Sequence, residues 1–313
     1  MKLILFLVAA AAAIVLLISW LCYRHAFYVS PKVKQNWPKY AIPEGEIYEP
    51  FRDQMVAWMD EIWALPHTNV EIKSFDGLTL RGKFYEYAPG APVELMFHGY
   101  RGSGERDLCG GVQRCFALER SALVVEQRGS AGSDGNIITF GIRESRDCLE
   151  WVKFAGEFFG PDIKLILTGI SMGASTVLMA AANELPPNVV GVLADCGFTS
   201  AEEIIRTVIR QMGLPDGISY PFVWLGARLF AKLDLSENSA LEAVKHCRLP
   251  VIFFHGDQDD YVPWQMSQKN FDACTAEKEL CIIHGAGHGL SYLVDPQGYL
   301  RTLRAFGKKY WGL

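Results

Sequence analysis

Six short apolar runs, separated by stretches with helical spacing, constrain the fold of this chain more than any other feature. Runs this short and nearly continuous suit strands that are buried on both faces of a parallel sheet. Helical patterns lie between most of them, so the alternation predicts an α/β fold with a mostly parallel, doubly wound sheet and right-handed crossovers. The apolar runs are 93–97, 122–125, 164–167, 189–193, 250–254 and 280–283, and the helical patterns are 104–119, 141–159, 172–184, 264–274 and 296–310.

Two further segments add to this core. Residues 70–87 alternate in two runs around Asp76-Gly77, which indicates a hairpin. No strand pattern occurs between 199 and 249, where 201–212 and 222–233 have helical spacing. An insertion of this kind commonly covers the site of an α/β enzyme, so we expect a helical lid at about 199–249. Helices that only pack on the domain would produce the same pattern.

The chain begins with an apolar segment. Residues 3–22 carry no charge, and a helix of twenty residues rises about 30 Å, the thickness of a bilayer core. Trp20 and Tyr23 lie at its end, where aromatic residues favour the headgroup region. A cleaved signal peptide usually has a shorter apolar region, and a soluble core helix is not apolar on every face. The sequence therefore predicts an uncleaved transmembrane anchor over 1–23.

The charges are unevenly distributed along the chain. Residues 1–40 contain five basic residues and no acid, whereas the remainder contains 25 basic and 35 acidic residues. The positive-inside rule then favours a single-pass anchor with the main domain on the cytoplasmic side. Scattered cysteines without a Cys-x-x-Cys pair favour the same reducing side. An acidic body without a clustered basic face argues against nucleic-acid binding, so the expected macromolecular contact is membrane lipid, through the N-terminal helix.

Residues 24–68 connect the anchor to the body. Pro31, Pro38 and Pro43 predict an extended linker over 30–47. Apolar residues with helical spacing over 51–63 predict an amphipathic helix that ends before Pro66. We expect this helix to pack on the domain, and the alternative is that it lies on the lipid surface. Residues 69–313 then form one catalytic domain that includes the lid.

The sequence Gly169-Ile170-Ser171-Met172-Gly173 matches the pattern G-x-S-x-G. The pattern alone is weak, but here it follows an apolar run and precedes a small-residue helical run at 174–182. This is the strand–turn–helix setting of a nucleophile elbow. The sharp turn exposes the Ser171 hydroxyl, and the N-terminus of the following helix favours negative charge beside it. Ser171 is the predicted nucleophile.

A serine hydroxyl needs a base, and that base needs a carboxylate to orient it. Enzymes with this elbow carry the serine, the acid and the histidine in that order along the chain. His288 lies in the glycine-rich segment 285–289, directly after the last apolar run. It is the predicted base, and His284 at the end of that run is its rival.

The predicted acid follows the preceding apolar run, 250–254. Asp259 is the preferred candidate and Asp260 is the next. Asp257 is expected to shape the turn through bonds to its own backbone. Asp195, one strand earlier, is a further alternative.

A tetrahedral intermediate also needs hydrogen-bond donors for its oxyanion. The backbone N–H of Met172, next to the nucleophile, is one predicted donor. The other is the backbone N–H of Tyr100, in the loop after the run 93–97, where Gly99 and Gly102 allow a tight backbone. His98 is expected to hold this loop in place.

Taken together, these motifs resemble the α/β-hydrolase superfamily, and within it membrane-anchored bacterial hydrolases near the serine aminopeptidase-like and lysophospholipase-like branch. The resemblance implies an α/β-hydrolase fold over about 70–313 and a triad of Ser171, Asp259 and His288. It selects Asp259 because the family places the acid three residues after the glycine of His-Gly. It also implies Met172 and Tyr100 as the oxyanion donors. The segments that carry it are HGY (98–100), RGSAGSDG (128–135), GISMG (169–173), HGDQDDYVP (255–263) and GAGHG (285–289).

The sequence thus predicts a serine hydrolase that cleaves small acyl esters, lipid-like ones included, through an acyl-enzyme and without a metal or organic cofactor. A serine aminopeptidase or amidase of the same fold is the alternative, because fold and triad do not fix the substrate. That enzyme would present a carboxylate to the substrate's ammonium group, and Glu202 and Glu203 are available. A non-catalytic scaffold is the third interpretation.

Overall fold

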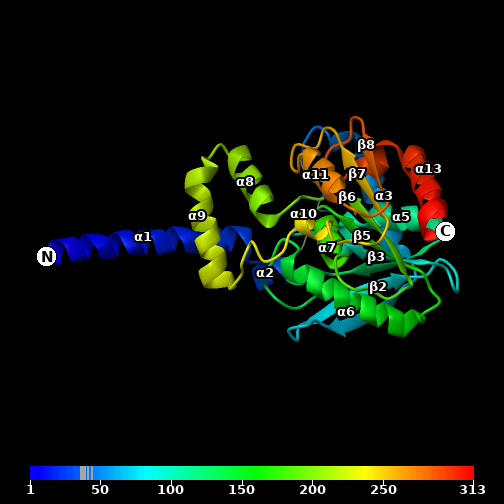
Figure 1. Cartoon of the computed structure of the whole chain (residues 1–313), viewed down its shortest axis with the longest axis horizontal. Helices are drawn as coiled ribbons and strands as arrows, with labels where there is room; N and C mark the ends of the chain where they lie inside the picture. The colour runs from blue at the N-terminus through cyan, green and yellow to red at the C-terminus, as the bar shows by residue number, and fades with distance from the viewer. Residues whose placement is uncertain (36–39, 41, 44) are drawn as a thin grey trace.

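The computed structural model describes residues 1–35, 40, 42–43 and 45–313 and contains one eight-stranded sheet (Figure 1). The strand order is β1-β2-β4-β3-β5-β6-β7-β8. The pairs β1–β2 and β2–β4 are antiparallel and all the others are parallel, which confirms the predicted α/β-hydrolase type of sheet. The strands are β1 (Thr68–Lys73), β2 (Thr79–Tyr85), β3 (Val93–Phe97), β4 (Ser121–Val125), β5 (Leu165–Ile170), β6 (Val189–Asp195), β7 (Val251–Gly256) and β8 (Lys278–Ile283).

Helices cover both faces of the sheet, and the strand residues alternate between them. Leu95 and Phe97 of β3 pack on the face that α6 and α7 cover, whereas Met96 packs with α5 on the other face. This alternation is the two-residue period of a strand, and it explains why the central runs are apolar throughout. The covering helices are α5 (Cys109–Ala117) and α13 (Pro296–Phe306) on one face and α6 (Ile142–Phe159), α7 (Met172–Ala180), α10 (Ala240–Ala243) and α11 (Gln265–Ala273) on the other.

Several elements differ in detail from the sequence prediction. The single helix expected over 104–119 is two helices, α4 (Gly104–Asp107) and α5, with Leu108 between them. Part of the expected extended linker is the short helix α2 (Pro31–Gln35), and Pro38 lies outside the described residues. The amphipathic helix α3 (Arg52–Ala64) packs on α5 and buries Met59 and Ile62. This is the expected packing on the domain rather than the alternative on the lipid surface.

The insertion between β6 and β7 is helical. Its first helix is α8 (Ala201–Gln211), which begins with the Ser200 hydroxyl accepting the Glu203 N–H and buries its isoleucines. Its second helix, α9 (Asp216–Gly226), begins six residues before the predicted 222, because Pro221 is tolerated within it, and a further turn continues over Ala227–Ala231. The insertion packs through apolar side chains in one cluster with Phe198 and with Met172, the residue after Ser171.

The N-terminal helix α1 (Lys2–Ala26) projects from the body, with α9 standing across it and α8 between α9 and the body (Figure 1). It is long and apolar enough to cross a membrane, and its side chains up to Ile18 are almost all exposed. The chain after it is built into the body. Phe27 and Val29 are buried, and a β-bridge joins Tyr28 to Ile137.

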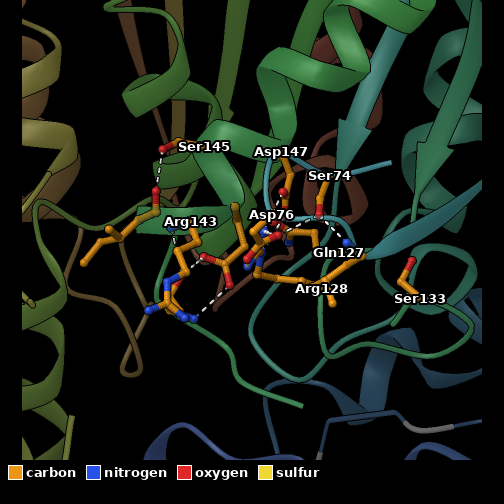
Figure 2. Close-up of polar contacts among 12 residues, drawn as sticks. Ser74, Asp76, Gln127, Arg128, Ser133, Arg143, Ser145 and Asp147 are labelled. Atoms are coloured by element: carbon orange, nitrogen blue, oxygen red, sulfur yellow. Dashed lines mark hydrogen bonds and ion pairs between the residues drawn. The ribbon is translucent and has the colours of Figure 1, made fainter. Parts of the chain in front are cut away.

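A buried ion-pair network braces the loop after β4. Figure 2 shows the guanidinium of Arg128 lying against Asp147 of α6 and Asp76 of the β1–β2 turn. Two Arg128 nitrogens contact the two Asp147 oxygens at 2.6 Å each, and two contact Asp76 at 3.0 Å each. Arg128 and Asp147 are both buried, so these bonds replace the hydration of the charges.

We expect Arg128→Ala to destabilise the protein by about 3–5 kcal/mol, because Asp147 would keep a buried carboxylate without its partner. Chemical unfolding in detergent, followed by tryptophan fluorescence, measures this change. Lys245→Ala is the matched control, since the Lys245–Glu242 pair is exposed and pairs of that kind contribute about 0–1 kcal/mol. Equal losses in the two variants would contradict the bracing role.

Candidate active site

Ser171 lies at the sharp turn between β5 and α7. Its backbone has φ 56° and ψ −119°, a strained conformation that the turn imposes. A Cβ atom at Gly169 would overlap the carbonyl of Gly173, and one at Gly173 would overlap the carbonyl of Phe97. Both glycines of the motif are therefore required by close backbone packing. The Ser171 N–H donates to the carbonyl oxygen of Asp195 at 2.8 Å, which ties the turn to the end of β6.

A chain of hydrogen bonds runs from this serine through a histidine to a carboxylate. His288 Nε2 lies 2.9 Å from Ser171 Oγ, and His288 Nδ1 lies 2.6 Å from Asp259 Oδ2. The other Asp259 oxygen accepts the backbone N–H groups of Tyr261 at 3.0 Å and Val262 at 2.7 Å. The carboxylate is therefore held in one orientation. The structure brings together the three residues that the sequence predicts as a triad.

The charges of the hydrogen-bonded residues shift the pKa values of both Asp259 and His288. Burial by itself would raise the pKa of Asp259, but the adjacent His288 and His255 outweigh it and hold the pKa well below its usual range. Burial would likewise lower the pKa of His288, but its electrostatic and hydrogen-bond interactions with Cys196 and the Asp259 carboxylate raise it well above 6.5. An imidazolium at this position is thus stabilised, as a base that takes a proton from serine requires.

The rival residues lie elsewhere. His284 is exposed and contacts Asp257 at 2.8 Å, and Asp257 also accepts the Gly285 N–H, so this pair holds the loop. Asp195 accepts the hydroxyl protons of Ser291 at 2.9 Å and Tyr299 at 3.1 Å. Asp260 has an exposed side chain. Among the described residues, Asp259 is the one carboxylate that contacts His288.

The two predicted oxyanion donors flank the serine. Met172 is the first residue of α7, and the loop that carries Tyr100 approaches so closely that a Cβ at Gly99 would lie 3.8 Å from Ser171 Oγ. Within the described part of the chain, neither the Met172 nor the Tyr100 N–H donates to another protein group. Both amides are therefore free to bind an oxyanion.

His98 holds the loop, as its buried position requires. Its Nδ1 lies 2.8 Å from the Gly99 carbonyl oxygen, and its Nε2 accepts the Gln127 N–H at 3.1 Å. Burial lowers the pKa of His98, which favours the neutral ring that this pattern of one donor and one acceptor needs. His98 therefore links the Tyr100 loop to the segment after β4 and has no direct contact with Ser171.

Sequence reasoning missed two neighbours of the site, Tyr48 and Cys196, and one contact of the predicted residue Tyr100. The Tyr48 hydroxyl donates to the His288 carbonyl oxygen at 3.2 Å. Cys196 lies beside His288. Its Sγ atom, a carboxylate oxygen of Asp259 and a ring nitrogen of His288, which are atoms that could bind a metal ion, lie within 4.8 Å of one another. A metal ion bound by these three residues would compete with the hydrogen bond between His288 and Ser171. The Tyr100 hydroxyl donates to the carbonyl oxygen of Ala26 at the end of α1. No local pattern indicates these contacts, because each joins distant segments.

A cavity of about 240 Å³ opens beside Ser171 and His288. Its wall includes Met55, Trp58 and Met59 of α3, so the helix before β1 is part of the site. The lining is mainly apolar, and its two carboxylates are engaged. Asp195 binds Ser291 and Tyr299, and Asp107 accepts the Gly99 N–H and pairs with Arg106. The two arginines of the lining are paired as well, Arg106 with Asp107 and Arg114 with Glu94, so the cavity suits an uncharged, apolar group.

Comparison with known proteins supports the architecture. No protein-family model matches the chain. Its sequence is 25% identical to the uncharacterized protein YqkD of Bacillus subtilis over 187 residues, 59% of this chain and 61% of YqkD, so the match spans less than two thirds of that relative. The structure resembles the esterase Pf2001 of Pyrococcus furiosus with a TM-score of 0.66 at 19% identity, over 80% of this chain and 93% of that one.

Similarity to the α/β hydrolase GrgF from Penicillium identifies the fold. It aligns with a TM-score of 0.59 at 19% identity, over 80% of this chain and 100% of its own. The chain has the α/β-hydrolase fold. In this fold the C-terminal edge of the parallel strands carries the site, and Ser171 and Asp259 follow β5 and β7 at that edge.

Proposed function

We propose that this protein is a serine hydrolase that cleaves carboxylic esters through an acyl-enzyme. The observation that carries the proposal is the hydrogen-bonded chain from Ser171 through His288 to Asp259. Ser171 Oγ attacks the ester carbonyl while its proton passes to His288 Nε2, and Asp259 stabilises the imidazolium. The oxyanion accepts hydrogen bonds from the Tyr100 and Met172 amides. His288 then protonates the departing alcohol, and water, activated by the same imidazole, releases the acid.

The cavity supports an ester substrate over one with a free ammonium group. Glu202 pairs with Arg206 at 2.8 Å, and Glu203 pairs with Lys269 at 2.5 Å and accepts the hydroxyl proton of Thr199. Neither glutamate is among the residues that line the cavity. An aminopeptidase needs an available carboxylate beside the scissile bond, and the carboxylates of this cavity are already paired.

Matched substrates test this preference. We expect hydrolysis of p-nitrophenyl butyrate at a kcat/KM well above that of an alanine p-nitroanilide, which presents an amide and a free ammonium group. A chromogenic assay of both with the full-length protein in detergent measures the ratio. A higher rate on the aminoacyl amide would replace the esterase proposal by the aminopeptidase one.

The pH dependence of kcat/KM should report the protonation of His288. Because the pKa of His288 lies well above 6.5, its ring is protonated at lower pH and accepts no proton from Ser171. We therefore expect kcat/KM for a short ester to rise with pH and to reach half of its plateau above pH 6.5. The profile of kcat/KM reports the free enzyme, in which the Asp259–His288 bond exists. A half-maximum below that value would show that Asp259 does not raise the pKa of His288.

We also propose that α1 is an uncleaved membrane anchor with the catalytic domain on the cytoplasmic side. Ser19, Phe27 and Val29 are buried against the body, so a cut before Cys22 would separate Ser19 from its packing. Up to Ile18 the helix is almost wholly exposed, unlike a soluble core helix. A reporter fused after Leu313 tests the orientation, and a reporter active only outside the cell would reverse it.

A further inference from the structure

The anchor helix and the lid are packed together directly. A Cβ atom at Gly226 of α9 would overlap the backbone oxygen of Ser19, so the two helices touch backbone to backbone where they cross. Ser19 is fully buried there, although the residues before it are exposed, and the rings of Tyr23 and Phe230 lie 5.7 Å apart beside the crossing. Small residues permit such close approach of helices. The position of α1 therefore fixes the position of α9.

The crossing lies at one end of the apolar part of α1. From Leu3 to Ser19 the uncharged part of the helix rises about 24 Å, most of the roughly 30 Å of a bilayer core. Beyond Ser19 come Trp20 and then Arg24, whose guanidinium lies 5.7 Å from the centre of the Trp20 ring. Tryptophan and arginine at the end of an apolar helix mark the headgroup region. The crossing point is therefore at the membrane interface.

The outer face of α9 is apolar. The large apolar side chains exposed along α9 and the turn after it are Ile218, Trp224 and Leu229, with 69%, 42% and 48% of their surfaces accessible. No acidic residue lies between Ile218 and Leu229. The basic residues of this segment are Arg228, which precedes Leu229 and pairs with Asp234, and Lys232 after it. A helix with large apolar residues outward and basic residues at its margin is the kind that lies in a membrane interface.

The exposed side chains lie away from α8, because Tyr220 and Val223 on the other side of α9 pack in one apolar cluster with Ile205 of α8. The direction of the outer face then follows from the arrangement of the helices in Figure 1. The free part of α1 leaves on one side of α9, and α8 lies on the opposite side, between α9 and the body. Helix α9 stands across α1, so when α1 spans the bilayer α9 runs along the membrane plane. The face turned away from α8 is then turned to the lipid.

We propose that Ile218 and Trp224 of α9, together with Leu229 of the turn that follows it, lie in the interfacial layer of the bilayer that α1 spans. The lid is thereby attached to the membrane surface as well as to α1. It also reaches the site, since Gln211 Nε2 at the end of α8 donates to the carbonyl oxygens of Asp260 at 2.5 Å and Tyr261 at 3.2 Å. This inference rests on the proposed anchoring by α1.

Fluorescence quenching by lipids tests the proposal without an enzymatic assay. Single cysteines at Ile218, Trp224 and Leu229 carry an environment-sensitive fluorophore in the full chain, in a background with Cys22→Ser and Cys281→Ser, which removes the two native thiols that are not buried. The protein is reconstituted into phosphatidylcholine–phosphatidylglycerol vesicles with or without spin-labelled lipid. Lys153→Cys, exposed on α6, is the aqueous control, and Leu7→Cys in α1 is the membrane control. Unchanged melting temperatures verify folding.

The expected result is lipid quenching at all three lid positions severalfold stronger than at Lys153, with protection from aqueous iodide. Quenching at Leu7 combined with aqueous behaviour at Ile218, Trp224 and Leu229 would overturn the lid proposal and leave the anchor intact. Aqueous behaviour at Leu7 as well would overturn the anchor, and the lid proposal with it. Disulfide cross-links between copies of the unlabelled Ile218→Cys protein, combined with no lipid quenching of the labelled protein, would identify a second copy of this chain as the occupant and also overturn the proposal.

Discussion

Ser171→Ala should lower kcat on p-nitrophenyl butyrate by about 10⁶-fold, because no other group can form the acyl-enzyme. His288→Ala should cost about as much, since Ser171 without a base is a weak nucleophile. The double variant should lose little more than either single one, because residues that act as a unit are not additive. Steady-state rates on the purified full-length variants measure all three.

Ser219→Ala is the matched control for this series. Ser219 lies on α9 and is not among the residues that line the cavity, so its removal should leave kcat nearly unchanged. Retention of more than about a thousandth of the parent rate in Ser171→Ala would assign the chemistry to another nucleophile. Additive losses for Ser171 and His288 would show that the two residues act separately.

Asp259→Asn should lower kcat by about 10⁴-fold. The amide has nearly the shape of the carboxylate, but it cannot stabilise an imidazolium, and it favours a ring tautomer unsuited to accepting the Ser171 proton. Asp260→Asn changes the adjacent exposed carboxylate and should leave kcat within a few-fold of the parent. The two rates, measured on the same ester, decide between the neighbouring aspartates.

Because Asp259 also accepts the backbone N–H groups of Tyr261 and Val262, the comparison needs a folding control. A normal melting temperature for Asp259→Asn ascribes the lost rate to chemistry. The reverse order of losses, with Asp260→Asn the more impaired, would contradict the assignment of the acid.

The sequence predicts the central sheet well because its signals are local. The run 93–97 coincides with β3, since every residue there is buried and none faces solvent. The elbow at Ser171 is also predicted from a local pattern, because close backbone packing at Gly169 and Gly173 excludes any side chain at these two positions. The acid is harder to identify, because three aspartates, Asp257, Asp259 and Asp260, follow the run 250–254. Only the folded chain shows that Asp259 is the one that contacts His288.

What the sequence could not reveal depends on contacts between distant segments. The helical spacing in α3 predicts an apolar face but not that Met55 and Trp58 line the cavity. The composition of α1 predicts a membrane helix but not that Gly226 packs on Ser19. Pro221 reads as a break in a helix, yet it lies within α9. In each case the structure depends on tertiary packing, and the sequence pattern of one segment does not show which other segment it packs against.

Labelling with a fluorophosphonate tests the central claim most directly, because the reagent forms a covalent bond only with an activated serine. The full-length protein is treated with the probe, digested and analysed by mass spectrometry. We predict one adduct, on the Ser171 hydroxyl, that is absent from Ser171→Ala and strongly reduced in His288→Ala. An unlabelled protein that is correctly folded, or an adduct on a different serine, would contradict the account.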